Sequence, residues 1–215
     1  MKPKRKRRAL FSAFRKSGEL INFADELRRL DWMILASGGT KRFLHDHNIP
    51  SMDIGTIVGK PILQGRVKTL DQRVHGSLLS RLEDQSDIVE LRELNMRSTE
   101  LVFVDLYPLG EELKRPGHTF DSVLEKIDMG GVALLRSAAK GMRIVVSSPD
   151  QFESVLRVIK HGPIASWGIQ WPRKFLCTLA ARAEETAAAH ARLAAEFYQS
   201  VADGTFSEEP IRRAV

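Results

Sequence analysis

Short apolar runs alternate with amphipathic segments along most of the chain, and this alternation predicts strands separated by helices. The clearest run is LVFVDLY, residues 101–107, which is continuous and rich in β-prone side chains, as a buried strand is. The runs ALFSAF, WMILA and MRIVVSS predict further strands at residues 9–14, 32–36 and 142–148. Strands joined through helices favour a mostly parallel sheet with right-handed crossovers.

Amphipathic periods predict helices after these strands. Residues 17–30 repeat apolar side chains largely on one helix face, and shorter helical patterns cover residues 41–47 and 149–160. From residue 173 to residue 199 the chain is rich in Ala, Leu, Arg and Glu, which predicts a long helix of high intrinsic propensity. The pattern therefore predicts one α/β domain with a C-terminal helical extension.

Charge changes this picture only at the N-terminus. The net charge is +6, and six basic residues lie among the first eight positions. Without them the basic residues equal the 27 acidic residues in number, so the body of the protein is balanced. We expect residues 1–8 to be a disordered, solvated tail, with polyanion binding as the alternative. No specific nucleic-acid partner is expected, because the body lacks basic residues interleaved with aromatic ones.

Composition excludes several classes of protein and site. A hydrophobic content of 43% is ordinary for a globular chain, and no apolar stretch reaches the roughly 18 residues of a membrane span, so we expect a cytoplasmic protein without a membrane partner. The single cysteine, Cys177, excludes a disulfide framework and a cysteine zinc cluster. The histidine spacings indicate no metal site. His75 is the histidine most expected near a ligand, and His190 is expected on a helix face.

Two segments suit a phosphate group. Ser37, Gly38, Gly39 and Thr40 follow a predicted strand and precede a helix, where free N–H groups and the helix dipole attract anions. The alternative is an ordinary tight turn with a hydroxyl N-cap. Lys16 follows the first strand, so it faces the same space if the first two strands are neighbours; otherwise it is a solvated lysine.

Three further groups of residues are candidates for ligand binding or catalysis. In GRVKTL, Arg66 and Lys68 point to one side if the segment is extended, with the Thr69 hydroxyl beside them; an exposed edge strand is the alternative. Tyr107 ends the strongest strand, and Asp105 inside that strand needs a partner. Asp128 precedes a Gly-Gly pair and an apolar helix, as an N-cap or as a catalytic carboxylate. Farther along that helix, Arg136 and Lys140 share one face, and an aspartate beside a buried lysine is a common acid/base pair; a capped helix with surface cations is the alternative.

The segments LFSAFRKSG, LASGGT, GRVKTL, DLYP, IDMGG and LRSAAK occur in an order that resembles the IMP cyclohydrolase domain of the bifunctional formyltransferase/cyclohydrolase family of purine biosynthesis. The resemblance covers about residues 9–199. It implies a methylglyoxal-synthase-like fold, a doubly wound mostly parallel sheet with helices on both faces, and a homodimer. We expect a nucleotide-binding domain at residues 9–165, a helical extension of that domain at 166–200, and a tail at 201–215.

The same resemblance implies a ring-closing cyclohydrolase. A carboxamide nitrogen attacks a formyl carbon on an imidazole ribotide, and water leaves, without cofactor, metal or ATP. Because an amide nitrogen is a poor nucleophile, the site must hold the near-attack geometry, remove a proton and stabilise the oxyanion. The partner is a nucleoside monophosphate, and a separate formyltransferase is a further expected partner because the chain ends at Val215.

Matched positions imply a role for each candidate residue. Lys68, Tyr107, Asp128 and Lys140 match catalytic positions, with Asp128 and Lys140 as the proton-transfer pair and Lys68 and Tyr107 polarising the formyl oxygen. Ligand-binding positions are Lys16, Ser37, Gly38, Gly39, Thr40, Arg66, Thr69, Asp105, Leu106, Met129 and Gly130.

Departures from the family pattern gather around the heterocycle more than around the phosphate. Phe14-Arg15 replace Ser-Asp, Asp71-Gln72 replace His-Pro, Asp105 replaces Asn, and AAKGM replaces AAKNH. Two alternatives therefore stay open: a paralogue acting on a related azole ribotide in a specialised nucleoside or modified-purine pathway, and a non-catalytic nucleotide-binding module.

Overall fold

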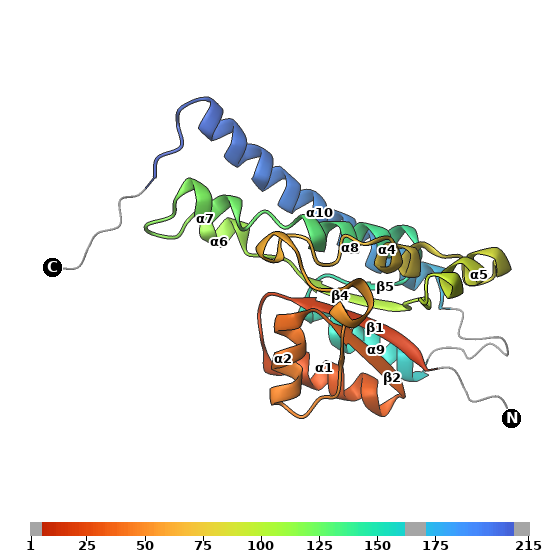
Figure 1. Cartoon of the computed structure of the whole chain (residues 1–215). Coiled ribbons are helices and arrows are strands. Elements are labelled where there is room, and N and C mark those ends of the chain that lie inside the picture. Colours follow the sequence, from red (N-terminus) through yellow and green to blue (C-terminus); the bar gives the residue numbers. More distant parts are fainter. Residues whose placement is uncertain (1–5, 162–170, 209–215) are drawn as a thin grey trace, which may run out of the picture.

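In a computed structural model of the protein, which describes residues 6–161 and 171–208, five parallel strands form one sheet in the order β3-β2-β1-β4-β5 (Figure 1). The chain runs outward from β1 through β2 to β3, then returns to β4 and β5 on the other side of β1. The predicted doubly wound parallel sheet is therefore confirmed. The strands are β1 (Arg7–Ala13), β2 (Trp32–Ala36), β3 (Met52–Asp53), β4 (Leu101–Asp105) and β5 (Ile144–Val146).

Helices cover both faces of the sheet (Figure 1). One face is covered by α1 (Gly18–Arg29), α2 (Gly38–Asp46) and α9 (Phe152–His161). The other is covered by α4 (Gln72–Leu79), α8 (Met129–Lys140) and the long α10 (Arg173–Ala202). The connections contain α3 (Gly55–Val58), α5 (Gln85–Glu93), α6 (Leu109–Glu112) and α7 (Phe120–Leu124). No helix in the described parts of the chain is both long and apolar enough to cross a membrane.

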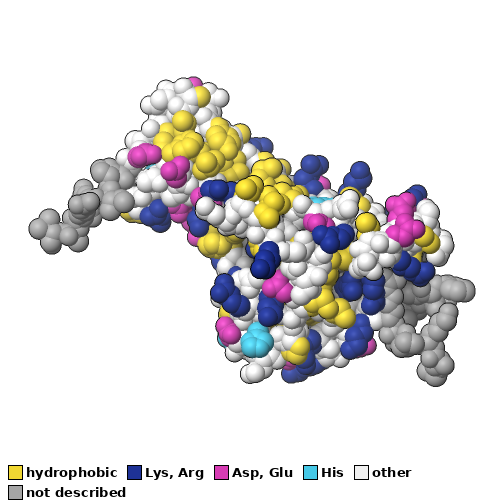
Figure 2. All heavy atoms as spheres, viewed as in Figure 1, with side chains coloured by type: hydrophobic (Ala, Val, Ile, Leu, Met, Phe, Trp, Pro, Cys, Tyr) yellow, Lys and Arg dark blue, Asp and Glu magenta, His cyan; other side chains and the backbone are white. Residues whose placement is uncertain are grey.

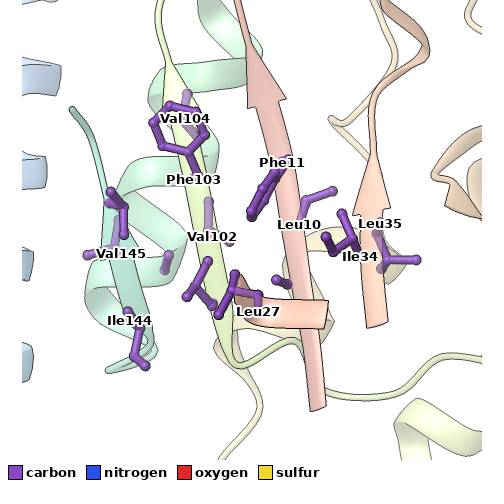
Figure 3. Close-up of a cluster of buried hydrophobic side chains, with 14 of the residues drawn as sticks. Leu10, Phe11, Leu27, Ile34, Leu35, Val102, Phe103, Val104, Ile144 and Val145 are labelled. Atoms are coloured by element: carbon purple, nitrogen blue, oxygen red, sulfur yellow. The ribbon is translucent and has the colours of Figure 1, made fainter. Parts of the chain in front are cut away.

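The core holds the carboxyl ends of the two central strands side by side. β1 and β4 pair with Ala9 opposite Leu101 and Ala13 opposite Asp105. Phe11 of β1 meets Phe103 of β4 edge to face, with ring centroids 5.8 Å apart, within the cluster that Figure 3 shows. Each large side chain removed from water here contributes roughly 1.5–3 kcal/mol. This packing makes the edge after Ala13 and Asp105 a rigid platform.

The N-terminal boundary differs from the expected one. Arg7 and Arg8, which we expected in a solvated tail, belong to β1 and pair in register with Trp32 and Met33. The Arg7 guanidinium lies 5.4 Å from the centre of the Trp32 ring, a cation–π contact that compensates for its partial burial. Residues 1–5, 162–170 and 209–215 lie outside the described residues, so the other domain boundaries stay predictions.

Gly141 ends α8 where that helix passes close to α4. A Cβ atom at this position would lie 1.9 Å from the Leu78 carbonyl oxygen, which is backbone and cannot swing aside. Gly141→Ala is therefore expected to lower the free energy of unfolding by about 2–3 kcal/mol, measured by urea denaturation. Gly18→Ala is the matched control, since a Cβ there meets no atom within 4 Å. Equal stability of the two variants would contradict this packing.

Candidate functional site

A cleft of about 770 Å³ lies at the carboxyl ends of β1, β2 and β4. Its walls are the loops that follow these strands, the segment of residues 64–70 and the loop that precedes α8. Open parallel sheets bind ligands at this edge, beside the point where the strand order reverses. The predicted site residues that line the cleft are Lys16, Ser37, Gly39, Thr40, Arg66, Lys68, Thr69, Asp105, Tyr107, Asp128, Met129 and Gly130.

One end of the cleft combines a helix N-terminus with two lysines. Ser37 is the N-cap of α2, and the first bond of that helix runs from the Lys41 N–H to the Ser37 carbonyl at 2.8 Å. The preceding N–H groups are those that a helix start offers to an anion. Burial lowers the pKa of Lys16; Asp105 opposes this effect, and the charge of Lys68 adds to it. An anion between Lys16 and Lys68 would relieve their repulsion.

Two residues of the predicted phosphate loop, Thr40 and Gly38, are not placed to bind a phosphate in the cleft. Thr40 is 1% exposed, and its hydroxyl accepts the Ala13 N–H at 3.0 Å and contacts the Ala13 carbonyl at 3.2 Å. This hydroxyl ties α2 to the end of β1, so it is not free to bind phosphate. Gly38 does not line the cleft. The backbone of the turn is the part that suits an anion.

The GRVKTL segment is not the extended strip that its sequence predicts. A 3₁₀ turn covers Leu63–Gly65, and Arg66 follows it with helical dihedral angles of φ −65° and ψ −31°. Arg66 forms an ion pair with Glu125, with its Nε 3.1 Å from the carboxylate. A protein carboxylate therefore balances Arg66. Lys68, which has no ion-pair partner within the described part of the chain, is the cation of this segment that is left for a ligand.

Asp128 caps α8 and also lines the cleft, so its two predicted roles are compatible. Its Oδ1 accepts the Gly131 N–H at 2.7 Å, and its own N–H donates to Nε2 of His190 at 2.9 Å. A Cβ at Gly131 would lie 2.5 Å from Asp128 Oδ2 and 2.6 Å from Leu106 Cδ2. A side chain at position 131 would therefore displace the Asp128 carboxylate or Leu106. Leu106, predicted to touch the ligand, packs against Gly131 and does not line the cleft.

Lys140 does not join the other predicted catalytic residues. It is exposed at the last position of α8, whereas Asp128 caps the first turn of that 12-residue helix. At 1.5 Å per residue the two lie about 18 Å apart along the axis. Within one chain Asp128 and Lys140 are therefore too far apart to form a proton-transfer pair, and the catalytic role of Lys140 stays a prediction. Two residues at opposite ends of one helix do not contact each other. A lysine in the last turn interacts favourably with the negative end of the helix dipole.

Two aromatic side chains form part of the cleft wall. Phe14 and Tyr107 meet edge to face at 5.4 Å, and the Lys126 ammonium lies 5.0 Å from the Phe14 ring centre and 5.8 Å from that of Tyr107. Burial, followed by the charges of Asp128 and Glu125, raises the pKa of Tyr107, so its hydroxyl stays a proton donor at neutral pH. Sequence reasoning missed Lys126, because EKID contains no spacing that singles out this lysine.

Two of the departures from the family pattern contact each other. The Asp105 carboxylate accepts the backbone N–H of Arg15 at 2.6 Å and its guanidinium at 2.9 Å. Arg15 also forms an ion pair with Glu111. The partner that Asp105 needs is thus Arg15, and both carboxylate oxygens are engaged. Asp105 borders the cleft without a free oxygen directed to a ligand.

His75 differs from expectation, whereas His190 lies where it was expected. His75 does not line the cleft; its Nδ1 lies 2.8 Å from the Ser137 hydroxyl and joins α4 to α8. His190 lies on a face of α10, as expected, and that face is buried, which leaves the residue 7% exposed. Within residues 6–161 and 171–208, no three or more His, Cys, Asp or Glu side chains are placed to hold a metal ion.

A family model described as an MGS-like domain matches residues 19–133. The chain belongs to the MGS-like domain family. The bifunctional purine biosynthesis protein PurH of Streptococcus agalactiae serotype III (strain NEM316) is 40% identical to it over 196 residues, which are 89% of this chain and 36% of that protein. PurH of Streptococcus pyogenes serotype M2 (strain MGAS10270) is 38% identical over 195 residues, with the same shares.

The chain thus spans little more than a third of the length of these curated relatives. The crystal structure of ForH is similar to this chain with a TM-score of 0.75 and 31% identity, covering 90% of this chain and 100% of that one. The resemblance seen in the sequence motifs is confirmed.

Proposed function

We propose that the protein is a ring-closing cyclohydrolase of the IMP cyclohydrolase type, acting on a formylamino-imidazole-carboxamide ribotide. The observation that supports this most strongly is the single cleft that joins an anion-binding end, formed by Lys16, Lys68 and the start of α2, to Tyr107 and Asp128. A sugar phosphate at one end extends its heterocycle toward the other.

The proposed chemistry needs proton transfers in two stages. In the first, a new C–N bond forms as the carboxamide nitrogen attacks the formyl carbon, the nitrogen loses a proton, and the formyl oxygen gains one. In the second, the hydroxyl so formed takes up a further proton and leaves as water, while the formylamino nitrogen loses its proton and the ring C=N bond forms. Asp128 has one oxygen on the Gly131 N–H and is assigned the proton from nitrogen. Tyr107, with its raised pKa, and the Lys68 ammonium are assigned to the oxygen. Within one chain, Lys140 lies too far from Asp128 to take part in these steps.

The decisive experiment is to incubate the protein with the formylated ribotide and to follow the formation of the hypoxanthine ring of IMP by ultraviolet absorbance. Ring closure that depends on Asp128 supports the proposal. Binding of IMP without turnover would overturn it in favour of a non-catalytic nucleotide-binding module.

The contact between Arg15 and Asp105 favours a second candidate, ring closure on a related azole ribotide. With Asp105 held by Arg15 and Phe14 beside Tyr107, the heterocycle meets an aromatic wall with Lys126 above it. Phe14→Ala is expected to raise the Kd for a nucleoside monophosphate about 10-fold, since stacking on a base contributes roughly 1–3 kcal/mol. Ribose 5-phosphate, which has no base, should bind both proteins equally in calorimetric titrations; an equal loss for both ligands would contradict the stacking role.

We also propose two partners. A homodimer is supported by the resemblance and by the exposed side chains of Leu124, Tyr198 and Val201 on the projecting end of the molecule, where Figure 2 shows hydrophobic side chains gathered. Sedimentation equilibrium tests it, and a monomer at micromolar concentration contradicts it. Because the formylated substrate has to come from a formyl transfer, a separate formyltransferase is the second proposed partner.

A further inference from the structure

The C-terminal helix α10 contacts the backbone of Asp128 through a buried histidine. His190 is 7% exposed on a face of α10 that otherwise buries alanine and aromatic or aliphatic side chains, among them Ala187 and Ala194. Its Nε2 accepts the backbone N–H of Asp128 at 2.9 Å. An imidazole buried at such a position loses hydration that the hydrogen bond must replace.

This hydrogen bond determines the state of the histidine ring. Nε2 accepts, so it carries no proton, and in the neutral ring the proton lies on Nδ1. The donor is the peptide N–H of the residue whose carboxylate caps α8. Asp128 is therefore held at two points: its Oδ1 accepts the Gly131 N–H, and its own backbone N–H donates to His190. Together these contacts set the direction in which the carboxylate enters the cleft.

We propose that His190 is a positioning residue, which orients the Asp128 carboxylate for proton transfer by accepting the Asp128 N–H from α10. The inference rests on the proposed function only in taking Asp128 as the proton acceptor. Another residue of α10, Tyr198, lines the cleft itself. The C-terminal helix thus shapes the site directly.

Turnover separates positioning from packing. His190→Leu, which removes the acceptor and keeps the volume, is expected to lower kcat at least 10-fold while KM changes less than threefold. His190→Gln, whose amide oxygen can accept the N–H, should recover most of kcat. Leu179→Val, a substitution at a buried position of the same helix that does not line the cleft, should leave kcat unchanged. An unchanged kcat in His190→Leu, or an equal loss in Leu179→Val, would refute the positioning role.

Amide hydrogen exchange tests the same contact without turnover. The Asp128 amide should exchange at least 10-fold faster in His190→Leu than in the wild type, with protection restored in His190→Gln. If the wild type does not close the ring yet shows this exchange pattern, the proposed function fails and the orienting contact stands. If ring closure is normal and exchange at Asp128 is the same in all three proteins, the inference is wrong.

Stability against pH provides a third readout. Burial lowers the pKa of His190 from 6.5, opposed by the charge of Asp128, so the unfolded chain binds this proton first and stability falls as the pH drops below about 6.5. His190→Gln should remove part of that loss, measured by urea unfolding. The elements packed against α10 carry these charged groups: Asp128, Arg136 and Lys140 at α8, and Glu111 and Glu112 on α6, whereas β5 carries none. Arg136 pairs with Glu184, and Glu112 with Arg115.

Discussion

Asp128→Asn is expected to lower kcat for ring closure by roughly 10²- to 10⁴-fold, the range that a positioned general base contributes. Asparagine is a good N-cap, so α8 keeps its start while the group that accepts the proton is lost. The Kd for IMP should change less than threefold, because the phosphate end of the cleft is untouched. Stopped-flow absorbance with the formylated ribotide and calorimetry with IMP measure the two quantities.

Lys140→Ala separates a site built within one chain from the scheme that the sequence predicts. Lys140 was the sequence-based partner of Asp128, and the structure places it exposed at the far end of α8. Values of kcat and KM near those of the wild type support a site built within one chain, and a loss of turnover supports the predicted role of Lys140. The assignment of Asp128 would be untenable if Lys140→Ala lost turnover while Asp128→Asn kept it.

Replacing Lys16 and Lys68 together by methionine is expected to weaken IMP binding by more than 100-fold. Each charged hydrogen bond to a phosphate contributes about 1.5–3 kcal/mol, which corresponds to roughly 10- to 100-fold in Kd. The single variants should each lose about 10-fold, and the salt dependence of binding should become shallower with each charge removed. Calorimetric titration of IMP at two salt concentrations measures both effects.

Arg66→Met provides the contrast within the same cleft. The Arg66 guanidinium is balanced by Glu125, so we expect a smaller effect on IMP binding than that of either lysine. A loss of affinity equal to that of Lys68→Met would contradict the reading that Arg66 is committed to the protein.

The elements of the fold could be predicted because each depends on neighbours in the sequence. The run WMILA coincides with β2, and the period over residues 17–30 with α1, which begins after its cap at Ser17. The two-residue β3 was missed because it is too short for any period. The start of α2 was expected at residue 41 but lies at Gly38, since glycine is unfavourable in a helix and hides such a start.

The sequence predicted only those parts of the site that follow from the order of the strands. Lys16, Ser37 and Tyr107 meet because their strands are adjacent in a parallel sheet, and each follows a carboxyl end. The contact between Arg15 and Asp105 spans 90 positions of sequence, and that between Asp128 and His190 spans 62. No local pattern indicates either contact, because the sequence around an arginine or a histidine does not distinguish a side chain with a distant partner from a solvated one.

By itself the sequence determined the class of fold, the family and the set of loops that carry chemistry, because hydrophobic period and motif order are local properties of the chain. Tertiary structure alone decided which of these side chains face one another. It removed Lys140 from Asp128, engaged Asp105 with Arg15 and Arg66 with Glu125, and brought His190 beneath the site. The physical reason is that charge balance and hydrogen-bond satisfaction depend on distances in space, which packing of the whole chain determines.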